Sequence, residues 1–131
     1  METLVIRTKR AREIADITDD VNKLLAKVGF KNGICHLFLL HTTAALATAD
    51  LDPGTDLDML DAFEAMSPKL KYRHPHDPSH VTEHILSSLV GASVMVPVKS
   101  GRLVLGSWQR VVLVEFSGPR EREIVVNTVF Q

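Results

Sequence analysis

The sequence is poor in several residue types, and each shortage argues against a class of protein. Its one cysteine, Cys35, rules out an intrachain disulfide framework. The apolar neighbours of Cys35 favour a small buried side chain over a reactive thiol. Aromatic residues make up 5% of the chain, which argues against stacking platforms for single-stranded nucleic acid. The net charge of −1 provides no strong field to attract nucleic acid or an anionic membrane.

Long apolar runs are also missing. No run approaches the roughly 18 residues that cross a bilayer, and the N-terminus lacks the hydrophobic region of a signal peptide. We therefore expect a cytoplasmic protein whose partners are neither nucleic acid nor membrane. With 131 residues, 45% of them hydrophobic, the chain is expected to form one domain over residues 1–131 with its own core.

Three segments have the residue pattern of helices. Residues 17–28 place apolar side chains at three- and four-residue spacing, and Gly29 is placed to end that helix. A second helix is expected from about Asp56 to Met66, with Thr55 as its N-cap. A third is expected over residues 80–90.

Segments rich in β-branched residues predict strands. They are residues 3–9, 13–15, 34–40, 93–98, 102–105, 111–116 and 123–130. The second of these could pair with the first. The small residues at 42–49 leave helix and strand open. This order predicts an α+β fold, with a largely antiparallel sheet that carries helices on one face.

The stretch from Gly101 to Arg122 contains the most informative strand, VVLVEF, and the chain's only tryptophan. Alternation places Val111 and Leu113 on the same face as Glu115, and the remaining apolar residues on the opposite face. Apolar side chains on both faces predict a strand that is buried on two sides. Glu115 therefore needs either a partner or an exit to solvent.

Six histidines are many for a chain of this length: His36, His41, His74, His76, His80 and His84. His80 and His84, four residues apart on a predicted helix, could present both rings to a metal, but the spacing alone favours a solvated surface over a metal site. His41 ends a buried strand and precedes several small residues, where a ligand can approach closely. A simple strand-end role explains His41 equally well.

Basic and acidic residues also cluster. Arg120 and Arg122 follow the Gly118-Pro119 turn, and with Lys99, Arg102 and Arg110 they suit either an anion site or charged sheet edges. The six acidic residues between positions 50 and 64 are explained by helix capping and a solvated helix face.

Several spaced motifs together resemble the YjbQ family. They are HTTAAL at residues 41–46, Tyr72-x-His74, His84-x-x-x-Ser88-Leu89-x-Gly91, and GRLxLGxWQ at residues 101–109, followed by Glu115 and Gly118-Pro119-Arg120-x-Arg122. The match covers nearly the whole chain. It implies a small α+β protein that assembles as a homotrimer and has secondary thiamine-phosphate synthase activity.

The resemblance also implies a site, residue by residue. Its catalytic residues are His41, His84 and Glu115; its substrate- and anion-binding residues are Thr42, Thr43, Gln109, Arg120 and Arg122; and its metal ligands are His41, His74 and His84. Neither His76 nor His80 matches a motif. Gln109 and Glu115 lie six residues apart on one strand, about 20 Å, so they cannot both contact one small ligand in one subunit unless a bulge or a break near Gly106 shortens the strand. We expect Glu115 to take part and Gln109 to have a structural or interface role.

The implied reaction joins hydroxymethylpyrimidine diphosphate to a thiazole phosphate and releases diphosphate. A small phosphorylated metabolite is therefore the expected partner, with a divalent metal as the expected cofactor. Three histidines suit zinc, whereas diphosphate chemistry usually recruits magnesium through oxygen ligands, and the sequence leaves this choice open. The alternatives are a non-enzymatic metal- or metabolite-binding trimer and a metal-assisted phosphate-ester hydrolase.

Overall fold

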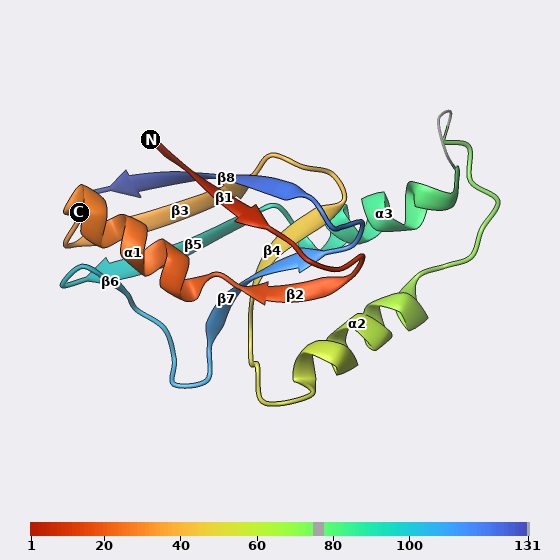
Figure 1. The fold of residues 1–131 in the computed structure, drawn as a ribbon, viewed down its shortest axis with the longest axis horizontal. Helices are drawn as coiled ribbons and strands as arrows, with labels where there is room; N and C mark the ends of the chain where they lie inside the picture. The colour runs from red at the N-terminus through yellow and green to blue at the C-terminus, as the bar shows by residue number, and fades with distance from the viewer. Residues whose placement is uncertain (75–77, 131) are drawn as a thin grey trace.

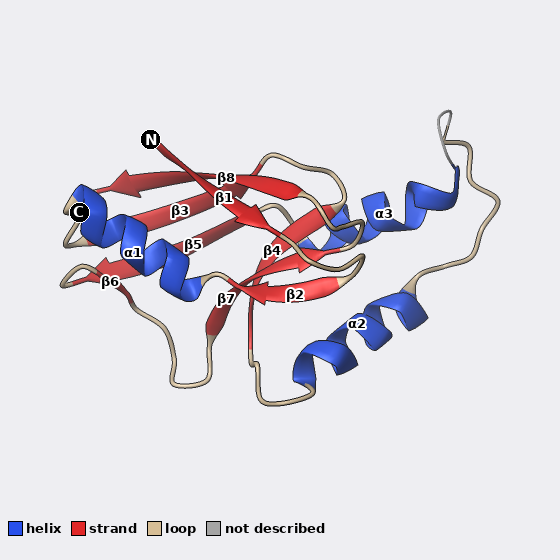
Figure 2. Cartoon of the chain, viewed as in Figure 1, coloured by secondary structure: helices blue, strands red, loops and turns tan. Residues whose placement is uncertain are grey.

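The computed structural model describes residues 1–74 and 78–130. Its strands are β1 (Glu2–Arg7), β2 (Glu13–Asp16), β3 (Gly33–Leu39), β4 (Ala44–Ala49), β5 (Ser93–Lys99), β6 (Arg102–Leu103), β7 (Arg110–Glu115) and β8 (Glu121–Val129). Its helices are α1 (Thr18–Val28), α2 (Thr55–Met66) and α3 (Val81–Val90), with a 3-10 turn, η1 (Pro78–His80), before α3 (Figures 1 and 2). In the described part of the chain, no helix has the length and apolar character needed to span a membrane.

The strands form two sheets, in which all neighbouring strands are antiparallel. The larger sheet has the order β1-β8-β3-β5-β6 and the smaller has the order β2-β7-β4. The predicted α+β class with largely antiparallel pairing is confirmed, although the strands are divided between two sheets. The suggested pairing of residues 13–15 with the first strand is wrong. These residues form β2, which pairs with β7 in the smaller sheet, because β7 is buried on both faces and needs a hydrogen-bonding neighbour along each edge.

The main core lies between the two sheets. Val111 and Leu113 of β7 face this core, where Val21 and Leu25 of α1 also pack. The other face of β7 packs under α3, with Leu86 in a second cluster. The predicted two-sided burial of this strand is therefore confirmed. Accordingly, α2 and α3 lie on the outer side of the smaller sheet, whereas α1 packs into the core between the sheets (Figure 1).

Local sequence explains the end of α1 but not the start of α2. Gly29 ends α1 in the left-handed conformation, with φ of 72°. The prediction of Thr55 as an N-cap is wrong, since Gly54 occupies that position and no side chain caps the helix. Thr55 is instead the first helical residue, and its backbone N–H donates to Asp52 O at 2.9 Å. The undecided residues at 42–49 form β4, whose alanines leave room for α3 to pack closely against the sheet.

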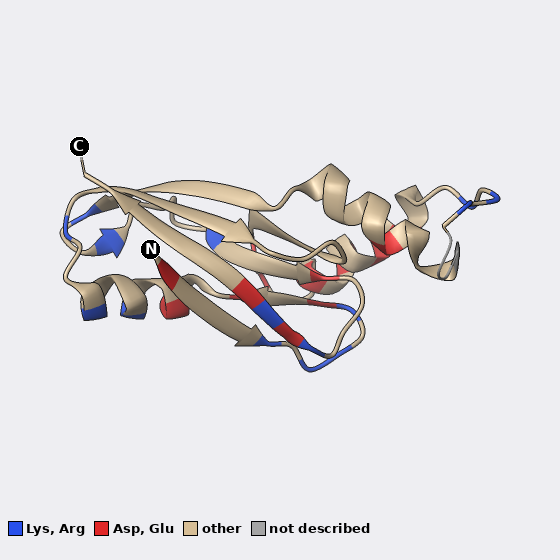
Figure 3. Ribbon diagram, turned by 90° about the horizontal axis from the view of Figure 1, so that it is seen from above, with Lys and Arg blue, Asp and Glu red and all other residues tan. Residues whose placement is uncertain are grey.

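The outer face of the larger sheet is exposed and partly apolar. Val5, Phe38, Met95 and Val129 lie on it with 42–65% of their surface accessible. Lysine and arginine residues are spread over separate parts of the molecule rather than gathered in one basic patch (Figure 3). The described residues therefore form no broad cationic surface.

Candidate functional site

A cavity of about 420 Å³ opens where β3, the β7–β8 turn and the start of α3 meet. Its lining residues are Leu40, His41, Thr42, Thr43, His74, His80, His84, Ser117, Arg120 and Arg122. Among the described residues that line it, there are two arginines and four histidines but no aspartate or glutamate. The structure thus gathers most of the predicted site residues from distant parts of the chain, around a hollow without acidic side chains in its described wall.

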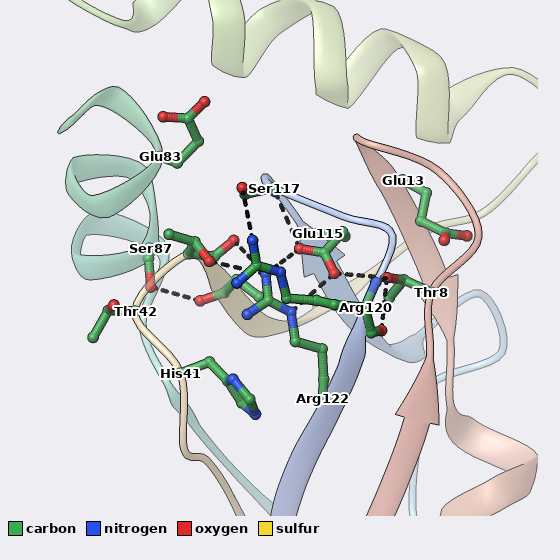
Figure 4. Close-up of polar contacts among 12 residues, drawn as sticks. Thr8, Glu13, His41, Thr42, Glu83, Ser87, Glu115, Ser117, Arg120 and Arg122 are labelled. Atoms are coloured by element: carbon green, nitrogen blue, oxygen red, sulfur yellow. Dashed lines mark hydrogen bonds and ion pairs between the residues drawn. The ribbon is translucent and has the colours of Figure 1, made fainter. Parts of the chain in front are cut away.

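The floor of the cavity is a buried ion pair between β7 and β8. Glu115 and Arg122 are each 0% exposed, and both face the space between the two sheets. Arg122 Nε donates to Glu115 Oε1 at 2.9 Å, and Nη2 donates to Oε2 (Figure 4). Because one partner belongs to each sheet, the pair ties the two sheets together beneath the cavity. The sequence predicts that Glu115, on a strand buried on both faces, needs either a partner or an exit to solvent. The structure shows that it has a partner, Arg122.

Arg122 is held on a second side by Thr43, just before β4. Arg122 Nη2 also donates to the backbone oxygen of Thr43 at 3.1 Å and to its hydroxyl at 2.9 Å. The remaining nitrogen, Nη1, is buried and has no hydrogen-bond partner in the described protein. An unsatisfied buried donor on a charged group costs free energy, so this nitrogen favours a ligand that brings an acceptor atom to the cavity floor.

The environment of Glu115 keeps it ionised. Burial by itself raises the pKa of Glu115, but hydrogen bonds from Arg122, Thr8 and the Ser117 backbone N–H, together with the charge of Arg122, more than compensate. The net effect is a pKa below the ordinary value of a glutamate. Glu115 is therefore a fixed anion that orients Arg122, and it lies beneath the cavity rather than among its lining residues.

Arg120 provides the second cation of the site. Its side chain is exposed and donates to Ser117 Oγ at 3.4 Å. Its backbone is fixed by Thr8, whose hydroxyl accepts from Arg120 N at 3.0 Å. No carboxylate pairs with the Arg120 side chain in the described part of the chain. Arg120 thus brings an uncompensated positive charge to the cavity.

His41 lies at the end of β3 and faces the same cavity. Its Nε2 accepts from the backbone N–H of Glu123 at 2.8 Å, so the neutral ring carries its proton on Nδ1. Burial and the charge of Arg122 lower the pKa of His41, and the nearby glutamates offset this only in part. His41 is therefore a neutral hydrogen-bond donor through Nδ1 near neutral pH.

His84 has the complementary arrangement. Its Nδ1 lies 3.0 Å from Thr42 O, and since a carbonyl only accepts, Nδ1 carries the proton and Nε2 keeps a lone pair. Ser87, one turn further along α3, fixes the helix by donating to Ala44 O at 2.5 Å. The His74 ring stacks on His84 with centroids 5.1 Å apart and planes 11° apart. His84 is thereby held in one tautomer, which suits an acid–base or ligand role.

Comparison with known proteins identifies the family to which the chain belongs. The family described as UPF0047 protein YjbQ-like matches residues 2–131. The chain belongs to the YjbQ family. It is 37% identical over 127 residues to a UPF0047 protein of Archaeoglobus fulgidus, covering 96% of this chain and 98% of that relative. It is also 37% identical over 123 residues to the UPF0047 protein YugU of Bacillus subtilis, covering 93% of each.

Two solved structures share the fold of this chain. A YbjQ-like protein of unknown function from Sulfolobus solfataricus, SSO2532, matches with a TM-score of 0.89 and 35% identity, covering 99% of this chain and 96% of that one. The hypothetical protein APE1520 from Aeropyrum pernix matches with a TM-score of 0.89 and 32% identity over the full length of both chains. The two-sheet arrangement that positions the cavity therefore matches that of solved relatives.

As they stand, the predicted metal ligands do not form a three-histidine centre. Among the described residues, no group of three or more His, Cys, Asp or Glu side chains is arranged to hold a metal ion. His41 Nε2 already accepts from the Glu123 backbone N–H, and His74 stacks on His84 instead of converging with it. The donor set fits an anion better than a metal ion.

Not every predicted residue reaches the cavity of this YjbQ-family protein. Gln109 is exposed and lies elsewhere, with its side chain bonded to Gly106 N at 3.1 Å and to Thr48 Oγ1 at 3.2 Å. His36 lies on the outer face of the larger sheet, 2.7 Å from Ser93 Oγ. His80 lines the cavity although it matches no motif, whereas His76 lies outside the described residues.

Sequence reasoning missed Thr8. This side chain is 7% exposed and its hydroxyl lies 2.7 Å from Glu115 Oε1. One signal was available, since Thr8 shares its parity along the chain with Leu4 and Ile6, which pack against the core. A threonine at the end of an inward-facing apolar series is thus a buried polar group that needs partners.

Proposed function

We propose that this YjbQ-family protein binds the phosphate groups of a small metabolite in the cavity and transfers its organic part with release of diphosphate, as a thiamine-phosphate synthase does. One observation carries the proposal. Arg122, whose buried Nη1 has no hydrogen-bond partner in the described protein, lines a cavity whose described lining contains no carboxylate. A phosphate oxygen is the acceptor that such a guanidinium binds best.

Charge distribution supports a phosphate ligand over a neutral one. Glu115 balances Arg122, so the excess positive charge comes from Arg120. The Nδ1–H of His41 adds a neutral donor beside the two arginines. Two guanidinium groups and a fixed donor in a partly enclosed site suit two or more phosphate oxygens.

In the proposed reaction, the ring nitrogen of a thiazole phosphate attacks the methylene carbon of hydroxymethylpyrimidine diphosphate. The new C–N bond forms as the C–O bond to the diphosphate breaks, and the diphosphate leaves with the bonding electrons. No proton must be removed, because the nitrogen becomes a thiazolium cation. The work of the protein is therefore to hold the leaving group, through Arg120 and Arg122, and to orient the two substrates.

Two further parts of the proposal come from the family resemblance. A divalent metal, if it takes part, would be held by His84 Nε2 and by phosphate oxygens, since the described histidines alone do not make a three-ligand set. A homotrimer is supported by the exposed apolar side chains on the outer face of the larger sheet, because an exposed apolar sheet face is a common subunit interface.

A second candidate reaction is hydrolysis of a phosphate ester. The observation that favours it is the tautomer of His84, which directs a lone pair on Nε2 away from Thr42 and so suits a general base for water. Hydrolysis uses the same arginines, so the two reactions differ in their products. Release of inorganic phosphate from a generic ester, without formation of thiamine phosphate, would favour hydrolysis.

The proposal is tested by calorimetric titration of the purified protein with diphosphate. We expect binding by the wild type and binding weaker by about tenfold or more by Arg120→Gln, since one charge-assisted hydrogen bond contributes about 1.5–3 kcal/mol. Arg110→Gln is the matched control because Arg110 pairs with Asp16 outside the cavity. Equal affinity in Arg120→Gln and the wild type would contradict the proposal.

Turnover is measured separately with the two thiamine precursors. Formation of thiamine phosphate that falls in Arg120→Gln and is retained in Arg110→Gln supports the transferase. Tight binding of diphosphate without turnover of either the precursors or a phosphate ester would instead indicate a non-enzymatic metabolite-binding protein.

A further inference from the structure

We infer that Thr8 is a positioning residue that holds Arg120 and Arg122 at a fixed separation in the anion site. The inference rests on the proposed function, since it assigns the element that sets the geometry of the two cations. Thr8 follows β1, and its hydroxyl contacts the Arg120 backbone directly and is linked to Arg122 through Glu115 (Figure 4).

The hydroxyl of Thr8 makes two bonds at once. It accepts from the Arg120 backbone N–H at 3.0 Å, and its oxygen lies 2.7 Å from Glu115 Oε1 and 3.1 Å from Arg120 O. A hydroxyl has one proton to donate. Arg120 O already accepts from the backbone N–H of Thr8 at 3.0 Å, so the proton goes to the nearer, charged acceptor on Glu115.

The result is a continuous series of hydrogen bonds between the two cations. It runs from the Arg120 backbone through the Thr8 hydroxyl to Glu115, whose carboxylate accepts from Arg122. Every side chain in the middle of this series is less than 9% exposed. Because water cannot easily replace a lost partner there, removal of one hydroxyl frees both ends of the series.

The turn that carries Arg120 is pressed directly onto Thr8. At Gly118, an added Cβ would lie 2.9 Å from Thr8 Oγ1 and 2.3 Å from Arg10 O. The backbone of the turn at Gly118 is therefore in close contact with Thr8 and cannot move toward it. Thr8 thus fixes the backbone of the exposed cation and the counter-ion of the buried cation with one atom.

Calorimetric titration with diphosphate tests this role in the full-length protein. Thr8→Val keeps the shape of the side chain but removes the hydroxyl, and we expect its dissociation constant to rise about tenfold or more. Thr8→Ser keeps the hydroxyl, and we expect its affinity to stay within about threefold of the wild type. Recovery by serine separates positioning from simple filling of space.

Thr18→Val is the matched control. Thr18 is 2% exposed, and its hydroxyl accepts from Val111 N at 2.8 Å in a part of the core that does not line the cavity. We expect this variant to lose stability like Thr8→Val, as measured by urea unfolding, while its affinity for diphosphate stays unchanged. Equal losses of affinity in both valine variants would overturn the inference.

The outcomes separate this inference from the proposed function. If the wild type does not bind diphosphate, the proposed function fails. If the wild type binds and Thr8→Val binds equally well, the positioning role alone fails. If Thr8→Val does not fold, Thr8→Ala replaces it, with the same expected loss and the same recovery by serine. Wild-type affinity in a folded Thr8→Ala protein would overturn the inference.

Discussion

Replacement of Glu115 by glutamine provides the sharpest test of the buried network. The change keeps the size of the side chain but removes the charge that balances Arg122, a residue with 0% exposure. The new amide NH2 group would also face a donor on Arg122, where the carboxylate now accepts. Glu115→Gln therefore leaves a buried positive charge without its counter-ion.

The expected cost is large. Breaking a buried ion pair by removing one partner destabilises a protein by about 3–5 kcal/mol. For a chain of this length, 1 kcal/mol shifts the melting temperature by about 4 °C, so we expect Tm to fall by about 12–20 °C. By contrast, Arg110→Gln breaks a partly exposed pair with Asp16 and is expected to cost about 1 kcal/mol or less.

The assay is urea unfolding followed by circular dichroism at a fixed protein concentration, at pH 7 and at low pH. The folded-state pKa of Glu115 is lowered, so its contribution is present above its unfolded pKa and is lost as pH falls through the folded pKa. The stability gap between wild type and Glu115→Gln should therefore narrow below about pH 4.5. A gap below about 1 kcal/mol at pH 7, or one that widens in acid, would refute the reasoning.

Three further predictions follow from single sites. Gly118→Ala should lose about 2 kcal/mol or more of stability because its Cβ would overlap backbone, whereas Gly106→Ala, with no atom closer than 3.6 Å, should unfold at nearly the wild-type urea concentration. The pKa of His41 is lowered in the folded protein, so as pH falls, His41 is protonated in the unfolded chain before it is protonated in the folded one. Wild-type stability should therefore fall as pH drops below about 6.5, the ordinary pKa of histidine. The fall should be smaller in His41→Gln, which lacks this group. Burial raises the pKa of Cys35 to about 11, so iodoacetamide at pH 8 should label it only after denaturation, and rapid labelling of native protein would contradict its burial.

Features that depend on local spacing could be predicted from the sequence. The apolar period of α1 and its closing Gly29 lie within one short segment, and the alternation in β7 alone indicates burial on two faces. The pairing of strands could not be predicted from the sequence in the same way. Nothing within the four residues of β2 distinguishes β7 from β1 as a partner, because that choice depends on which strand is buried on both faces and needs a hydrogen-bonding neighbour along each edge.

In the candidate site too, the residues could be predicted but their contacts could not. The resemblance to the YjbQ family pointed to the histidines and arginines, but not to how they interact. Thr42 and His84 are 42 residues apart, and the tautomer of His84 follows from a backbone carbonyl that no side-chain motif reports. Thr8 was missed because a threonine near a strand end looks like a surface residue until its partners, more than 100 positions away, are known.

The helix α2 has a consequence for how the site opens. None of its residues is buried, and it packs on the smaller sheet through few contacts, so its amide hydrogens should exchange with solvent through a low-energy, sub-global opening. The chain that leaves α2 leads to His74, which stacks on His84. If α2 detaches from the sheet, the segment before His74 gains conformational freedom. The Glu115–Arg122 ion pair, which lies in the core, would stay formed. The cavity therefore has a floor held by a buried ion pair and a rim that is connected to a weakly packed helix.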